Sequence, residues 1–173
     1  NDAAAALGDA IGGDHVTFAK RMTRTTRELG MTRTQYRNPS GLPNPAQVTT
    51  ARDIATLSLR IQRDFPEYYG YFRIPSFVYK GKTIGTHNKL IGHYDGVDGI
   101  KTGYIAAAGF NLTTSVKRGD KRLVGVVLGA PSGGARNRYM MAMLDPLFAK
   151  VPGAAKGRVA ALAGSPPGFS GKI

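Results

Sequence analysis

The stretch that most constrains the fold is residues 110–128, where two different strand patterns meet at a turn. From Phe110 to Lys117, apolar or threonine positions alternate with more polar ones, as in a strand with one buried face. Arg118-Gly119-Asp120-Lys121 predicts a turn, and Leu123 to Leu128 is almost wholly apolar, as in a strand covered on both faces. The segment therefore predicts an antiparallel pair with other layers packed around it.

Two further patterns add to this pair. A third strand is predicted at Gly99–Ile105, and Phe77–Tyr79 and Thr83–Ile84 flank Lys80-Gly81-Lys82 as in a small hairpin. The apolar strand at 123–128 is expected to be central in its sheet, with neighbours on both sides. Three strands make a small sheet, so we expect that some sheet edges lie outside these residues.

Helical patterns lie before the strands and after them. The first is expected at Asn1–Ile11, stopped by Gly12-Gly13, and the second between the cap Asp14 and Gly30. A third follows the cap Thr50 and ends before Pro66, and a last one follows Pro131–Gly134. Helices and strands segregated in this way predict an α+β class, with an antiparallel sheet flanked by helices.

The expected organisation is one domain portion and a short tail. Residues 1–150 are assigned to the domain, with a helical part over 1–72 and the strands plus the last helix over 73–150. The end of the chain, 151–173, is expected to be a linker or tail because Gly, Pro and Ser become frequent there.

The composition excludes several classes of function. The 24 Lys and Arg against 11 Asp and Glu give a net charge of +13, which favours anionic partners. The basic residues are scattered and form no long run, so solubility is the preferred explanation and nucleic acid is not expected as a partner. The absence of cysteine excludes disulfides, thiolate zinc sites and a cysteine nucleophile. The three histidines have no metal-ligand spacing, and no metal or cofactor is expected.

The strongest local motif is Lys101-Thr102-Gly103, which follows Asp98-Gly99-Ile100 and precedes Tyr104. Such a triplet alone is weak, but here it lies on a predicted strand with two more strands and a helix after it. A strand edge offers backbone groups to an extended peptide, the threonine offers a hydroxyl, and the lysine adds positive charge. The glycine lets a ligand approach the backbone closely.

With its surroundings, this motif resembles the low-molecular-weight penicillin-binding proteins that are serine-type D-alanyl-D-alanine carboxypeptidases. The resemblance runs from Asn1 to about Phe148 and implies the fold shared by penicillin-binding proteins and β-lactamases, here lacking its N-terminal part. The blocks that carry it are Leu29-Gly30-Met31, Asn38-Pro39-Ser40-Gly41-Leu42-Pro43, His87-Asn88-Lys89-Leu90, Gly96-Val97-Asp98-Gly99-Ile100-Lys101-Thr102-Gly103-Tyr104, Ala108-Gly109-Phe110-Asn111-Leu112 and Leu123-Val124-Gly125-Val126-Val127-Leu128-Gly129-Ala130.

The family has two further motifs, and the resemblance places them at or before the start of this sequence. Asn1-Asp2-Ala3-Ala4 matches the end of the family's Ser-x-Asn motif, so its serine is expected two positions upstream of Asn1. The nucleophile of the Ser-x-x-Lys motif is expected further upstream, because no serine in the 173 residues has lysine three positions later. We therefore expect this chain alone to be inactive and poorly stable without its N-terminal part.

The resemblance also implies roles for six residues. Asn1 would hydrogen-bond the substrate amide, and Lys101 would supply positive charge near the reacting groups. Thr102 would bind the terminal carboxylate, with Gly103 beside it, while the Tyr104 N–H would donate to the oxyanion hole. Arg136 would help to hold the carboxylate. One departure from the family is Ile105, where a threonine is usual.

The implied activity is hydrolysis of peptidoglycan stem peptides ending in D-Ala-D-Ala, through an acyl-enzyme that β-lactams also form. The implied setting is an exported protein in the periplasm or cell envelope of a bacterium, with possible peripheral membrane association. Two other functions remain open at this stage. One is a relative that binds the peptide without catalysis, and the other is a basic module that binds an anionic polymer.

Overall fold

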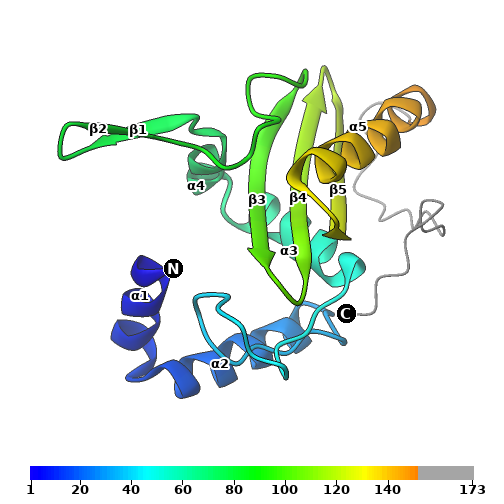
Figure 1. The fold of residues 1–173 in the computed structure, drawn as a ribbon. Helices are drawn as coiled ribbons and strands as arrows, with labels where there is room; N and C mark the ends of the chain where they lie inside the picture. The colour runs from blue at the N-terminus through cyan, green and yellow to red at the C-terminus, as the bar shows by residue number, and fades with distance from the viewer. Residues whose placement is uncertain (152–173) are drawn as a thin grey trace.

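The computed structural model describes residues 1–151 and places helices around a three-stranded antiparallel sheet (Figure 1). The linker or tail expected from residue 151 onward therefore lies, apart from Val151, outside the described residues. The helices are α1 (Asp2–Gly12), α2 (His15–Glu28), α3 (Ala51–Asp64), α4 (Pro66–Tyr69), the 3₁₀ helix η1 (Gly70–Arg73) and α5 (Gly133–Lys150). The strands are β1 (Ser76–Tyr79), β2 (Lys82–Gly85), β3 (Val97–Ile105), β4 (Gly109–Arg118) and β5 (Lys121–Ala130).

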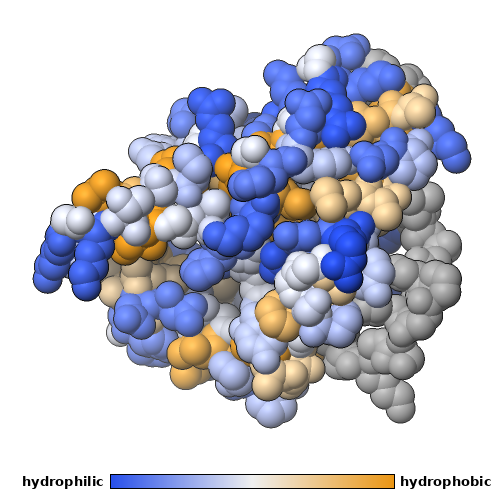
Figure 2. Space-filling model, turned by 45° about the horizontal axis from the view of Figure 1, so that its top comes forward, coloured by the Kyte–Doolittle hydropathy of each residue, from blue (hydrophilic) through white to orange (hydrophobic). Residues whose placement is uncertain are grey.

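The main sheet has the order β3-β4-β5, with antiparallel pairing throughout. This confirms the three predicted strands, each of which extends by one or two residues beyond its sequence pattern at one end or both. The predicted small hairpin is β1–β2, and it projects away from the main sheet (Figure 1). Large apolar side chains such as Phe77 and Val78 are exposed on it, beside hydrophilic residues at its tip (Figure 2).

Helices cover both faces of the main sheet. Helix α5 lies across one face (Figure 1), and its side chains Met140 and Leu144 are buried against Leu112 and Val116 of β4. Helix α3 contacts the opposite face, where the Ser58 hydroxyl lies 3.0 Å from the Thr113 hydroxyl. The alternation along β4 is therefore explained by an apolar face toward α5 and a more polar face toward α3.

The strand predicted to be central is at an edge in the part of the chain that the structure describes. Strand β5 lies between α3 and α5, which agrees with the expectation that both of its faces are covered. Within residues 1–151, β4 is the middle strand and β5 pairs with β4 alone, so the second neighbour predicted for β5 would lie outside these residues and stays a prediction. Most of the β5 side chains are only half-buried. The apolar pattern reports covered faces, and it contains no information about which edge is paired.

Local capping signals position three of the helices. The Asp14 carboxylate accepts hydrogen bonds from the backbone N–H of Val16 and Thr17, both at 2.8 Å. Thr50 and Ser132 cap α3 and α5 in the same way. Asn1 precedes α1, but its side chain forms no capping hydrogen bond. The three capped ends fix where α2, α3 and α5 begin. The Asn1 side chain forms no such cap and is therefore available for another contact.

A buried carboxylate joins the segment after α2 to α3. The Asp53 side chain is 5% exposed and accepts hydrogen bonds from the Arg33 backbone N–H at 2.9 Å and from the Thr34 hydroxyl at 2.7 Å. Thr34 also contacts the Thr49 hydroxyl. This arrangement fixes the segment after α2 against α3, the helix that contacts the sheet. Among the described helices, none is long and apolar enough to cross a membrane.

Candidate active site

All six residues assigned a role from the sequence line one groove of about 1050 Å³. They are contributed by the start of α1, by strand β3 and by the first turn of α5. The full lining is Asn1, Ser40, Gly41, Leu42, His87, Lys89, Lys101, Thr102, Gly103, Tyr104, Ile105, Phe110, Gly133, Gly134, Arg136 and Asn137.

The groove runs along the edge of β3. Side chains of a strand alternate between its two faces, yet five consecutive residues from Lys101 to Ile105 all line the groove. This is possible where a groove follows an edge rather than a face. Strand β3 is at the end of the strand order, so in residues 1–151 its outer edge is not paired with another strand. Such an edge can take an extended peptide as an additional strand.

Open space surrounds the glycine of the motif. A Cβ atom placed on Gly103 would meet no heavy atom within 4 Å, so the backbone at this position is accessible. Next to it, the ring of Tyr104 lies 4.4 Å from the ring of Phe110, centroid to centroid, and remains 60% exposed. The two rings form an apolar part of the groove wall beside the polar edge of the strand.

Arg136 is a buried cation at one end of the groove. Its residue is 6% exposed, and burial lowers the pKa of its guanidinium. The guanidinium donates to the Asn137 side-chain oxygen, with Nη2 at 2.9 Å, and Nη1 lies 3.4 Å from the Asn111 backbone oxygen. Both acceptors are neutral, and within residues 1–151 no carboxylate pairs with Arg136. A buried guanidinium in this state is well suited to an anionic ligand.

The two residues assigned to catalysis lie on different elements. Lys101 is exposed on β3, and its ammonium donates to the Thr102 backbone oxygen. Asn1 is exposed at the start of α1, where its backbone oxygen accepts from the Ala5 N–H at 2.9 Å. The structure brings both into the same groove as Arg136, although the three are far apart in the sequence.

The sequence reasoning missed other residues of the groove. His87 and Lys89 enter it from the turn after β2, and Ser40 to Leu42 enter it from the segment after α2. Both segments belong to the blocks that resemble the family, so the sequence did contain a signal that they matter. The blocks give the residue types and their order, but they do not say which side chains face a ligand.

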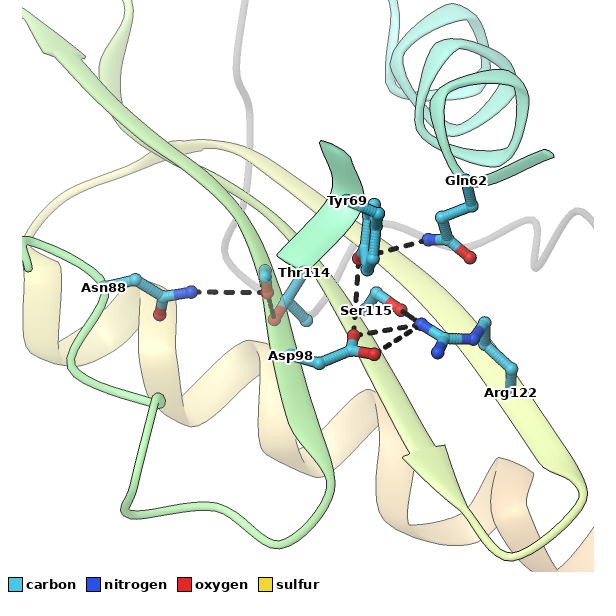
Figure 3. A network of polar contacts seen from close by, with 8 residues as sticks. Gln62, Tyr69, Asn88, Asp98, Thr114, Ser115 and Arg122 are labelled. Atoms are coloured by element: carbon cyan, nitrogen blue, oxygen red, sulfur yellow. Dashed lines mark hydrogen bonds and ion pairs between the residues drawn. The ribbon is translucent and has the colours of Figure 1, made fainter. Parts of the chain in front are cut away.

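A polar network supports the start of β3 (Figure 3). The Asp98 carboxylate pairs with the Arg122 guanidinium, with Oδ2 and Nη1 2.7 Å apart, and accepts from the Tyr69 hydroxyl at 3.3 Å. Arg122 also donates to the Ser115 hydroxyl at 2.6 Å, and Gln62 contacts the Tyr69 hydroxyl at 3.3 Å. The network joins α3, α4 and all three strands just before the Lys101-Thr102-Gly103 segment, which it holds in place.

This network predicts a loss of stability at high pH. Burial, with the nearby Asp98 carboxylate, raises the pKa of Tyr69 to about 12, while an unfolded tyrosine ionises near pH ~10. Stability from the neutral Tyr69 is complete below pH ~10 and is lost as pH rises toward ~12, because the unfolded chain releases the proton first. In urea unfolding between pH 9 and 11, the free energy of unfolding should therefore fall less steeply with pH for Tyr69→Phe than for the wild type. The two curves should begin to differ near pH ~10.

The matched control for this titration is Tyr71→Phe, since Tyr71 is 70% exposed on the neighbouring 3₁₀ helix. It should leave the pH dependence unchanged. Equal slopes for the wild type and Tyr69→Phe would contradict the assignment of the decline to Tyr69.

Comparison with known proteins identifies the class of protein that this fold and groove define. A D-alanyl-D-alanine carboxypeptidase of Bacillus subtilis, DacF, is 34% identical over 155 residues, and DacC of Escherichia coli is 39% identical over 131 residues. Penicillin-binding protein 5 from Haemophilus influenzae superposes with a TM-score of 0.81 at 33% identity and covers 86% of this chain. Penicillin-binding protein D2 from Listeria monocytogenes, solved with cefotaxime bound, gives 0.79 at 31% identity and also covers 86%.

The family model described as D-alanyl-D-alanine carboxypeptidase, of the S11 peptidases, matches residues 1–132. The chain belongs to this family. It spans 40% of the length of DacF and 33% of the length of DacC, and 44% of the Haemophilus influenzae structure. The predicted penicillin-binding fold is thereby confirmed for the part that the chain shares with these relatives.

Proposed function

We propose that this chain forms the substrate-binding part of a serine-type D-alanyl-D-alanine carboxypeptidase that acts on peptidoglycan stem peptides. The observation that carries the proposal is the single groove that brings together Asn1, the Lys101-Thr102-Gly103 edge and Arg136. A segment with the Ser-x-x-Lys motif, which the 173 residues do not contain, would complete the site. The outer edge of β5, which is unpaired within residues 1–151, supports the proposal, since further strands could pair there.

In this proposal, the peptide lies along the outer edge of β3 with its terminal carboxylate toward Arg136 and Thr102. The serine oxygen attacks the carbonyl carbon before the last D-Ala, an ester forms, and the D-Ala amine leaves with a proton. The developing oxyanion receives hydrogen bonds from the Tyr104 N–H and from the N–H of the serine itself. Water then hydrolyses the ester and frees the serine.

The side chains on the groove have complementary tasks. Asn1 orients the substrate amide, Lys101 provides a positive field at the reacting centre, and the open Gly103 lets the peptide backbone approach. Ile105 replaces a hydroxyl with an apolar group on the groove wall, which would change the contacts with the substrate rather than the chemistry. The family and the relatives support a bacterial, exported, cell-envelope protein that β-lactams acylate.

Intact-mass spectrometry of the full-length protein, with and without benzylpenicillin, tests the proposal. We expect one penicillin mass to be added, and proteolysis should place it on the serine of the Ser-x-x-Lys segment. A protein that hydrolyses no D-Ala-D-Ala peptide and gains no mass, but still binds the peptide, would instead be a non-catalytic relative. A protein that binds only anionic polymer, with steep salt dependence, would overturn both.

A further inference from the structure

Nearly half of the net positive charge lies in one stretch of the helical part. Residues 15–52 contain seven Lys and Arg but a single acid, Glu28, so the stretch contributes +6 to the net charge of +13. Six of these cations are exposed on α2 and on the segment that follows it: Lys20, Arg21, Arg24, Arg27, Arg33 and Arg37. We call these six residues the α2 basic surface. They form no run in the sequence, and the fold brings them together.

The period of the helix gathers the four cations of α2 on one side. With 3.6 residues per turn, the four lie within an arc of about 120°. The buried residues Ala19 and Thr26 lie on the other side of the helix, so the arc faces solvent. Glu28 is the one acid on this arc. From Lys20 to Arg27 the arc extends about 10 Å along the helix axis.

The segment after α2 adds its two arginines to the same surface. It runs back alongside the helix (Figure 1), since the Tyr36 backbone N–H donates to the Thr23 hydroxyl at 2.9 Å. One turn further along α2, the Thr26 hydroxyl lies 3.5 Å from the Thr34 backbone oxygen. The two arginines flank these contacts along the segment, and both are exposed. They therefore extend the row of cations sideways from the helix.

The α2 basic surface has no ion-pair partner within residues 1–151. None of its six cations forms an ion pair with a carboxylate there. Arg27 donates to the Met31 backbone oxygen, which is a neutral acceptor. The two carboxylates that flank the stretch are already engaged, because Asp14 caps α2 and Asp53 accepts from the backbone at residue 33. Clustered cations without counter-ions attract a partner with several negative charges.

The residue types indicate the kind of anion. Five of the six cations are arginines, and a planar guanidinium matches the oxygens of a phosphate with two parallel hydrogen bonds. The exposed arc from Lys20 to Glu28 carries no large apolar side chain. A helix that lies on a bilayer needs such side chains to enter the acyl region, so a lipid surface fits less well. A flexible polymer with one phosphate per unit can instead follow the row of cations.

We propose that the α2 basic surface binds a linear phosphodiester polymer, in addition to the reaction in the groove. None of its six cations lines the groove, so the two sites are separate. The inference does not depend on the proposed function, because it uses different residues and a different ligand. Binding would hold the protein on the polymer and leave the turnover of a small soluble peptide unchanged.

Fluorescence anisotropy of the full-length protein with a labelled 12-unit abasic deoxyribose-phosphate oligomer tests the surface. This probe presents phosphodiesters without bases. Two triple variants that lower the net charge by the same amount are compared with the wild type. The surface variant is Lys20→Gln with Arg21→Gln and Arg24→Gln. The control variant is Lys80→Gln with Lys82→Gln and Lys117→Gln, which are exposed lysines on or beside the strands.

The surface variant should weaken binding at least about tenfold near 0.1 M salt, because three phosphate contacts are lost. The slope of log K against log salt concentration should become shallower by about 2. The control variant should stay within about threefold of the wild type, since it changes only the general field. Both variants should keep the wild-type rates of penicillin acylation and D-Ala release.

Four results would overturn the inference. Equal weakening by both variants would assign binding to net charge alone, and equal affinity for poly-L-glutamate would remove the preference for phosphate. Binding to phosphatidylglycerol vesicles but not to the oligomer would assign the surface to a membrane. A lower thermal midpoint of the surface variant, with no oligomer binding in the wild type, would assign the cations to a contact inside the protein. Oligomer binding by a protein that penicillin does not acylate would refute the carboxypeptidase and support this surface.

Discussion

Replacing Lys101 with methionine in the full-length protein should lower the rate constant for acylation by benzylpenicillin at least about 100-fold, as for other lost transition-state stabilisers. Lys101 is exposed and makes no ion pair in the described part of the chain, so its removal leaves no buried partner behind. The thermal midpoint should therefore change little. A large loss of rate without a loss of stability is the result expected for a residue that acts on the reacting groups.

Two further variants sharpen this experiment. Lys82→Met removes an exposed lysine from strand β2, outside the groove lining, and should keep the wild-type acylation rate. Lys101→Arg keeps the positive charge but replaces a compact ammonium with a planar group, so we expect it to recover only part of the lost rate. Stopped-flow measurement with a fluorescent penicillin gives the rate constants. A Lys101→Met rate within about threefold of the wild type, well below the effect of a lost stabiliser, would exclude the proposed role.

The local elements of this fold could be predicted because their signals are local. Asp14 and Thr50 cap their helices with hydrogen bonds to residues two or three positions away, so the sequence itself contains both partners. The strand patterns at 110–117 and 123–128 similarly record which faces are covered. They do not record which edge is paired: β5 lies at an edge of the described sheet, and the second neighbour predicted for it stays a prediction.

The groove could not be predicted from residue patterns, because it is formed by long-range contacts. Asn1, Lys101 and Arg136 come from three elements, and nothing in their own neighbourhoods says that these elements meet. The resemblance to a family linked them, and the structure places them together. Their individual roles remain predictions until variants are measured.

The buried polar contacts could not be predicted from residue patterns either. The pairing of Asp98 with Arg122, and of Asp53 with the segment at 33–34, joins residues about 20 positions apart. A charged residue in a strand or a helix reads as exposed in sequence, since ionised side chains are rarely buried without partners. The structure provides these partners, and the pair of Asp98 with Arg122 holds the strand from which the groove is built.

A second large effect is expected at Gly96, one residue before β3. Its φ is +81°, a conformation that favours glycine, and its backbone oxygen accepts from the Lys117 N–H at 2.8 Å. A Cβ atom on Gly96 would lie 2.3 Å from the Lys117 backbone oxygen, which cannot move without breaking the end of β4. Gly96→Ala therefore combines backbone strain with a steric clash and should lower the free energy of unfolding by about 3 kcal/mol or more.

Gly119→Ala separates the two causes. Gly119 also has a positive φ, +61°, but an added Cβ would meet no heavy atom within 4 Å, so only the backbone strain of about 1 kcal/mol is expected. Urea unfolding of the full-length protein gives the free energy of unfolding of both variants. The transition of the penicillin-binding domain is recognised because benzylpenicillin acylation shifts it. Equal effects of the two variants would show that the contact between Gly96 and Lys117 is not tight. A larger effect at Gly96, together with slower acylation, would show that this contact sets the position of β3 and hence of Lys101.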